Sequence, residues 1–182
     1  MYKRKVLDNV GKSFDKGVMI TTGKSIYAAV FRNGKILLRF RKETGSLMNE
    51  DLSHKWELVG GVIGLDELGE LREGSAYQVP YIDALGRHLF DKAGLQLDFN
   101  LNDGMQIVVI PALYAKNDLI DEAMVCPLNW SDVRVNGFED LEGSNNVGFF
   151  DFDEVQTLDI VSNRMKFMIE QAFLFRKRVS GL

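Results

Sequence analysis

The spacing of apolar residues near the start of the chain is typical of a β-hairpin. Segment 25–31 is rich in β-branched and aromatic residues, and segment 35–41 alternates apolar with basic side chains. Between them stands Asn33-Gly34, the dipeptide that most favours a two-residue turn because both positions take positive φ. The pattern predicts two antiparallel strands, the second with one apolar face and one basic face that carries Arg39 and Arg41.

Two later segments carry apolar residues at helical spacing. The first begins near Pro80, which suits a first helical turn because its missing N–H is not needed there, and it ends before Gly94, a natural residue just after a helix. The second helix is predicted over 164–175. The apolar stripes of the two helices are Ile82, Leu85, Leu89 and Ala93 in the first, and Met165, Met168, Ile169, Ala172 and Phe173 in the second.

Three further apolar stretches predict strands. Segment 54–59 leads into Gly60-Gly61, which we interpret as a glycine turn, and segment 105–115 is a long apolar run. Segment 147–152 precedes Asp153, which is placed to cap the segment after it.

The remaining segments have less regular patterns. Residues 1–24 are expected to be an N-terminal extension with edge strands, residues 68–79 an excursion before the first helix, and residues 117–145 a long loop. No repeat, low-complexity tract or linker divides the chain. A single domain over residues 1–182 is therefore predicted.

Composition excludes several function classes. The net charge of −4 argues against general nucleic-acid binding. Cys126 is the only cysteine, so no intrachain disulfide can form, which fits a reducing cytosol. No run approaches the roughly 18 to 20 apolar residues that span a membrane, and no apolar signal core follows the basic N-terminus. A cytoplasmic protein with no membrane partner is expected.

One set of residues has the order strand, glycine pair, acidic residue, and a helix that ends on glycine. These residues are Trp56-Glu57-Leu58-Val59-Gly60-Gly61, Glu67, Arg87, Leu89, Gly94 and Leu95. They resemble the box of the Nudix (MutT-like) family, written G-x5-E-x7-R-E-U-x-E-E-x-G-U, with U an aliphatic residue. Segment 149–155 and the helix after it also look like the C-terminal signature of that family. The resemblance implies an α/β fold of the α+β type, the Nudix-like α/β/α sandwich with a mixed β-sheet.

The box is degenerate, because residues 68–86 fill the x7 gap and three helix positions differ. His88 stands where the family has the glutamate after arginine, and Asp91-Lys92 stand where it has a glutamate pair. Family carboxylates hold a divalent cation that activates water and neutralises the leaving phosphate. The resemblance thus implies a reduced site for Mg²⁺ or Mn²⁺ formed by Asp91, Glu67 and His88. Poor magnesium binding is predicted.

Each of these side chains also has a plainer interpretation. His88 would face solvent on a surface helix, and Asp91 would form a helix-surface ion pair with Arg87. Lys92 would be a solvated last-turn lysine that complements the helix dipole instead of contacting phosphate. Gly60-Gly61 would serve only the backbone turn.

Acidic residues in the irregular segments leave further alternatives open. The resemblance pairs Glu67 with Arg87, a role that anchors a loop and needs no metal. The group Glu139, Asp140 and Glu142 falls where some family members carry a catalytic base, and a surface loop is the alternative.

The strand before the box lines the substrate cleft in the family. Two guanidinium groups on that strand can hold phosphate oxygens in bidentate fashion, and a solvated hairpin face is the alternative. By resemblance, the residues assigned to substrate binding are Arg39, Arg41, Gly60, Gly61 and Lys92, and those assigned to catalysis are Glu67, Arg87 and Asp91.

Two functions follow from the resemblance. The first is a metal-dependent hydrolase that cleaves a nucleoside diphosphate linked to another moiety. The alternative is a catalytically inactive Nudix-fold protein that binds a nucleotide or an ADP-ribose-like ligand in a regulatory role, and a scaffold built on 68–79 and 117–145 is a third interpretation. The expected partner is a nucleotide-type small molecule. A homodimer is compatible with the resemblance, since dimers are common among such proteins.

Overall fold

The computed structural model describes residues 24–42, 46–47, 50–51, 53–64, 79–98, 108–116, 119–135 and 146–180. In chain order, the elements within these ranges are β1 (Lys24–Arg32), β2 (Lys35–Phe40), β3 (Ser46–Leu47), β4 (Glu50–Asp51), β5 (Trp56–Glu57), β6 (Val59–Val62), α2 (Val79–Ala93), β7 (Leu95–Leu97), β8 (Val108–Lys116), β9 (Leu119–Asn129), the 3-10 helix η1 (Trp130–Asp132), β10 (Val133–Val135), β11 (Val147–Phe150), α3 (Phe152–Thr157) and α4 (Asn163–Ser180).

The main sheet is mixed, as the family resemblance implies. Its strand order is β11-β2-β1-β9-β8, with β5 beside β2 and β6 beside β1. Strand β1 runs parallel to β9, whereas its pairings with β2 and β6 are antiparallel. The predicted hairpin is confirmed: Asn33 and Gly34 have φ of 51° and 82°, and Arg32 pairs with Lys35 across the turn.

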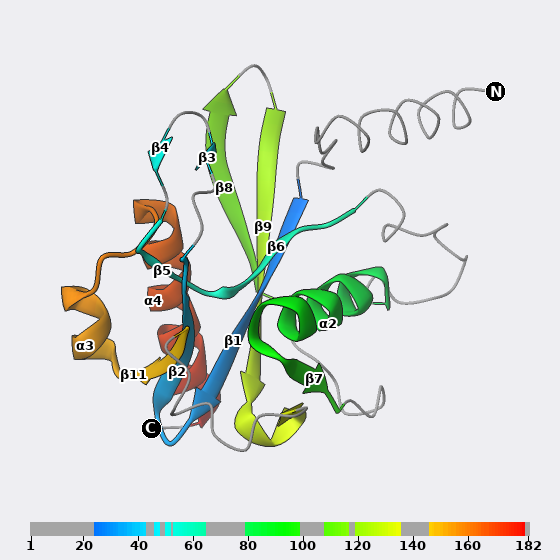
Figure 1. Ribbon diagram of the computed structural model, residues 1–182, viewed down its shortest axis with the longest axis vertical. Coiled ribbons are helices and arrows are strands. Elements are labelled where there is room, and N and C mark those ends of the chain that lie inside the picture. The colour runs from blue at the N-terminus through cyan, green and yellow to red at the C-terminus, as the bar shows by residue number, and fades with distance from the viewer. Residues whose placement is uncertain are drawn as a thin grey trace.

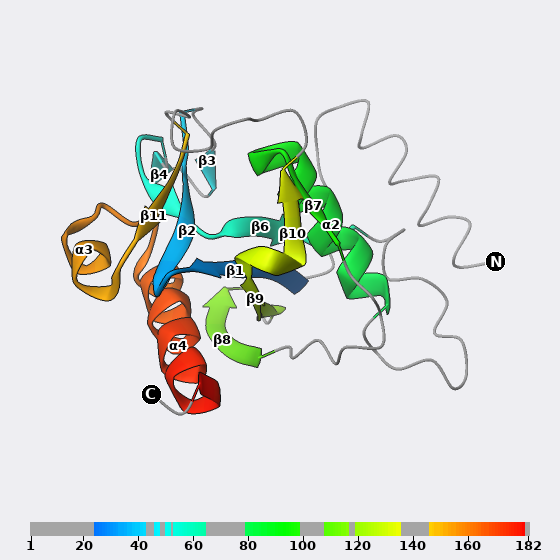
Figure 2. The same cartoon turned by 90° about the horizontal axis from the view of Figure 1, so that it is seen from below.

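Helices cover both faces of this sheet (Figures 1 and 2). Alternate residues of β1 point to opposite sides, so Ile26 and Val30 join the core under α2, while Ala29 and Phe31 join the core under α3 and α4. Because both faces are buried, the central strand is apolar from Ile26 to Phe31 instead of alternating. The result is the expected α/β/α sandwich.

The two predicted helices are present at the predicted places. Helix α2 begins at Val79, next to Pro80, and Gly94 follows it with φ of 66° and donates its N–H to Phe90 O at 2.9 Å. Helix α4 buries most of its predicted stripe, namely Met165, Met168, Ile169 and Ala172, with Phe173 partly buried. None of the helices formed by the described residues is long and apolar enough to cross a membrane.

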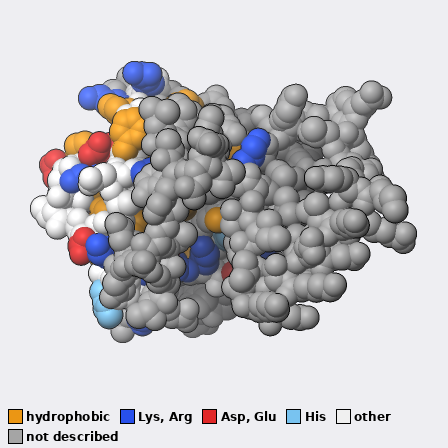
Figure 3. Space-filling view, turned by 90° about the horizontal axis from the view of Figure 1, so that it is seen from above, with side chains coloured by type: hydrophobic (Ala, Val, Ile, Leu, Met, Phe, Trp, Pro, Cys, Tyr) orange, Lys and Arg blue, Asp and Glu red, His pale blue; other side chains and the backbone are white. Residues whose placement is uncertain are grey.

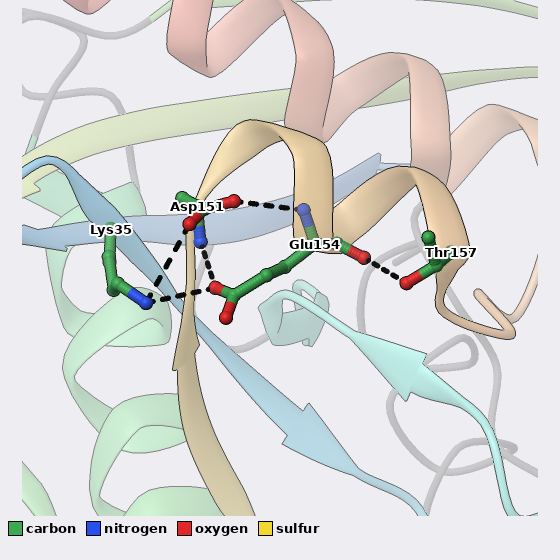
Figure 4. Close-up of polar contacts among 4 residues, drawn as sticks. All are labelled: Lys35, Asp151, Glu154 and Thr157. Carbon is green, nitrogen blue, oxygen red and sulfur yellow. Dashed lines mark hydrogen bonds and ion pairs between the residues drawn. The ribbon is translucent and has the colours of Figure 1, made fainter.

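A short helix, α3, joins the last strand to α4, and Asp153 does not cap it. The N-cap is Asp151, whose side chain accepts from Glu154 N at 2.9 Å, while Glu154 accepts from Asp151 N at 2.7 Å. The ammonium of Lys35 lies 3.0 Å from Glu154 and 3.7 Å from Asp151, so strand β2 is tied to the start of α3 (Figure 4).

The prediction of a long loop over 117–145 is wrong for most of that range. Residues 119–129 form β9, which lies between β1 and β8, and residues 133–135 form β10, which pairs with β7. Ala123, Met124 and Val125 of β9 are all buried because α2 and α4 cover opposite faces of the sheet. Such a strand has no apolar–polar alternation from which it could be predicted. Residues 1–23, 65–78 and 136–145 lie outside the described residues, and with them Glu67 and the 139–142 acidic group.

Candidate functional site

The two glycines of the box form strand, not a turn. Gly60 pairs with Tyr27 and Gly61 with Ile26, within the antiparallel ladder between β6 and β1. A Cβ on Gly60 would lie 2.3 Å from Ile26 O and 2.5 Å from the Cα of Tyr27. The glycine therefore serves a close approach of two backbones, and the sequence interpretation as a turn is wrong because it considered only local flexibility.

Gly61 opens the space that two side chains of α2 occupy. A Cβ there would lie 2.9 Å from both His88 Cε1 and Lys92 Nζ. These residues stand one helical turn apart, so both reach the β6 backbone from the same side of α2. The glycine pair thus lets the helix pack directly on the strand.

His88 is buried, at 5% exposure, and the interpretation of it as a solvent-facing residue is wrong. Its Nε2 lies 2.9 Å from Val62 O, a contact in which the nitrogen donates its proton. Val62 O also accepts from Arg87 NH2 at 3.3 Å. With Nε2 donating to a carbonyl, that nitrogen has no lone pair to offer a metal.

Lys92 is likewise not a freely solvated lysine. Its ammonium donates to Gly60 O, from the last turn of α2. Burial lowers the pKa of Lys92 from 10.5 to about 8; the carboxylate of Glu57 opposes this shift, and the charges of Arg39, Arg41 and Arg87 add to it. The lysine therefore lies among other cations in a partly dry environment.

Arg39 lies two residues after Leu37, which belongs to the core under α2, so it shares that face of the sheet. Arg41 follows directly after the end of β2. Arg39 pairs directly with Glu57 across β2 and β5. The two carboxylate oxygens of Glu57 are divided between them, Oε1 at 3.2 Å from Arg39 Nε and Oε2 at 3.2 Å from Arg41 NH1. The alternative of a solvated hairpin face is wrong, because both guanidinium groups are largely covered and paired.

Glu57 is a central residue of this site that sequence reasoning did not single out. It is 5% exposed, yet it carries a carboxylate in a strand between the apolar neighbours Trp56 and Leu58. Acidic residues are almost never buried without a partner, so a glutamate in a strand of this kind signals a nearby cation. We call Arg39, Arg41, Glu57 and Lys92 the basic cluster.

The described residues do not fit a divalent cation. They contain no group of three or more His, Cys, Asp or Glu side chains placed to hold a metal. Asp91 is exposed on α2, His88 donates to a carbonyl, and Glu57 is already paired with two arginines. A hard cation such as Mg²⁺ needs several oxygen ligands at once, and the basic cluster would repel it. Glu67, the remaining predicted ligand, lies outside the described residues.

No protein-family model matches the chain, and no curated protein matches it in sequence. Its fold is similar to that of a MutT Nudix hydrolase from Burkholderia pseudomallei, at 20% identity over 81% of this chain and 95% of that one, with a TM-score of 0.50. It is also similar to the Nudix domain of Shewanella oneidensis NrtR complexed with ADP ribose (14% identity, 90% and 92% covered, TM-score 0.50). A third similar structure is an ADP compounds hydrolase (11% identity, 87% and 73% covered, TM-score 0.53).

Proposed function

Because the chain has the Nudix fold, we propose that it binds a nucleotide-type compound through a diphosphate group at the basic cluster, without hydrolysing it. One observation carries this proposal. Two of the helix positions that hold glutamates in the family, those of His88 and Lys92, carry side chains that bond to the β6 backbone. These residues fasten the helix to the strand, and Lys92 adds positive charge where the family's chemistry needs negative charge.

The class of ligand follows from the charge of the cluster and from the fold. Guanidinium groups match paired phosphate oxygens in bidentate geometry, and an ammonium adds a point charge. Among the similar structures, the NrtR domain is complexed with ADP ribose and another is named for ADP compounds. An ADP-ribose-like ligand is therefore the first to test.

Turnover is not part of the proposal, because the described residues offer no carboxylate set for metal-assisted attack of water. Asp91 is a single exposed carboxylate on α2. One such group holds Mg²⁺ weakly, since this ion binds protein through carboxylates together with substrate phosphates and water.

The test compares ADP-ribose, ADP and adenosine, with binding measured by titration calorimetry and product release measured in parallel with Mg²⁺ and with Mn²⁺. The expected result is binding of the two phosphate compounds, no binding of adenosine, and no release of AMP or phosphate. Lys92→Met should weaken binding, whereas Lys177→Met, which removes an exposed lysine near the end of α4, should not. Metal-dependent release of AMP that is lost in Asp91→Ala would instead establish a hydrolase.

A further inference from the structure

The basic cluster concentrates positive charge in a chain that is negative overall. Three cations, Arg39, Arg41 and Lys92, surround the carboxylate of Glu57, while the chain as a whole carries −4. Figure 3 shows Lys and Arg side chains at several separate places on one face of the molecule, some of them near acidic ones. What distinguishes the cluster among the described residues is its burial, because buried like charges cost free energy unless a counterion balances them.

Glu57 already demonstrates how this cluster holds an anion. Each of its oxygens lies 3.2 Å from a different guanidinium group, Arg39 on one side and Arg41 on the other. A phosphate group can likewise accept a charge-assisted contact from each of two guanidinium groups. The two arginines are therefore arranged to receive an oxyanion, and the protein supplies one from its own chain.

One carboxylate does not satisfy the cluster. The Nε of Arg39 is buried and, among the described residues, has no aligned hydrogen-bond partner, even though Glu57 lies close enough for an ion pair. Lys92 bonds only to a neutral carbonyl among the described groups, and burial and the three nearby arginines lower its pKa. A second anion beside Glu57 would stabilise both donors.

We propose that the ammonium of Lys92 takes the place of the divalent cation in this site, so that Lys92, Arg39 and Arg41 bind the ligand's diphosphate directly and without metal, while Glu57 serves as their internal counterion. This inference rests on the proposed function, because it says how that same site holds its ligand. It assigns two residues opposite effects on affinity: Lys92 attracts the diphosphate, and Glu57 competes with it.

The experiment uses inorganic pyrophosphate and ADP-ribose as probes, with binding to the full chain measured by calorimetry in EDTA and again in excess Mg²⁺. Both probes should bind in EDTA, and pyrophosphate should bind more weakly in Mg²⁺ because the metal neutralises it. Lys92→Met and Arg39→Gln should each weaken pyrophosphate binding by about tenfold, the equivalent of one charge-assisted hydrogen bond. Glu57→Gln should strengthen binding by about tenfold, because it removes a negative charge next to the ligand.

Matched controls lie on α4, where Lys177→Met and Arg178→Gln remove exposed charges and should leave affinity unchanged. Lys92→Gln replaces Lys92→Met if the latter does not fold. Binding that requires Mg²⁺ would overturn this inference and leave the proposed function standing. Failure of both probes to bind under every condition would overturn the proposed function as well. A loss of affinity in Glu57→Gln, with native folding, would show that Glu57 positions the arginines and does not compete.

Discussion

Lys92 is expected to lower the stability of the fold near neutral pH, and Lys92→Met should therefore make the protein more stable. The pKa of Lys92 falls from 10.5 to about 8 in the folded state. At 1.36 kcal/mol per pKa unit, keeping the ammonium charged at neutral pH costs about 3 kcal/mol. The variant also loses the hydrogen bond to Gly60 O, which lowers its stability by about 1 kcal/mol. The variant should gain about 2 kcal/mol, or roughly 4 to 8 °C in Tm for a domain of this size.

The pH dependence of this effect has a definite sign. An unfolded lysine keeps its proton up to its ordinary pKa of 10.5, whereas folded Lys92 releases it near 8. Between these values the unfolded state binds more protons, so the stability of the wild type rises with pH. From pH 7 to pH 9.5 the rise from this group is about 2 kcal/mol. The advantage of Lys92→Met should therefore nearly disappear at the higher pH.

The assay is urea unfolding of both chains at the two pH values, in EDTA and without ligand. Cys126 has the opposite effect on how stability changes with pH. Burial raises the pKa of its thiol from 9.0 to about 12, so at high pH the unfolded state loses this proton first and the folded state becomes less stable. Both chains contain this cysteine, and its effect cancels in the difference between them. A variant less stable than the wild type at pH 7, or an advantage that does not change with pH, would refute the reasoning. If Lys92→Met is more stable at pH 7 as expected, the chain keeps a lysine that destabilises its fold, as expected of a binding residue.

Three further predictions concern the packing around the site and the sheet. Gly60→Ala should destabilise the fold by about 3 kcal/mol or more, because the added Cβ meets backbone atoms of β1. Gly61→Ala should cost about 2 kcal/mol, because its φ of 158° disfavours an L side chain and the added Cβ meets His88 and Lys92; wild-type stability of either variant in urea unfolding would contradict this. Asp151→Ala should lower the Tm, and Asp151→Asn should lower it less, since the amide oxygen still accepts from Glu154 N. Hydrogen bonding by the backbone N–H of Glu154 and by its side chain holds the pKa of Asp151 below its ordinary value. The stability that the Asp151 carboxylate adds should therefore be lost as the pH falls through this lowered pKa. Cys126 is buried with a raised pKa and should resist a thiol reagent in native protein but react in urea, and rapid labelling of the native chain would count against the assigned burial.

The sequence by itself determined the elements whose signals are local. Asn33-Gly34 dictates the hairpin turn because both residues accept positive φ, and Gly94 ends α2 for the same reason. The apolar stripe of α4 and the alternation of Arg39 and Arg41 with apolar neighbours depend only on residues a few positions apart. These features survive in the structure because nearby contacts are enough to form them.

The tertiary structure decided everything that depends on segments distant in sequence. Strand β9 was missed because it is buried on both faces, and only its two neighbours make it a strand. The roles of His88 and Lys92 were misread because they depend on α2 packing against β6, about thirty residues earlier in the chain. The role of Gly60 was misread because it depends on β6 pairing with β1. Glu57 looked like an ordinary polar position until β2 brought two arginines to its carboxylate. A charged side chain acquires its chemistry from what surrounds it, and burial and charge neighbours are set by packing between elements, which no local pattern encodes.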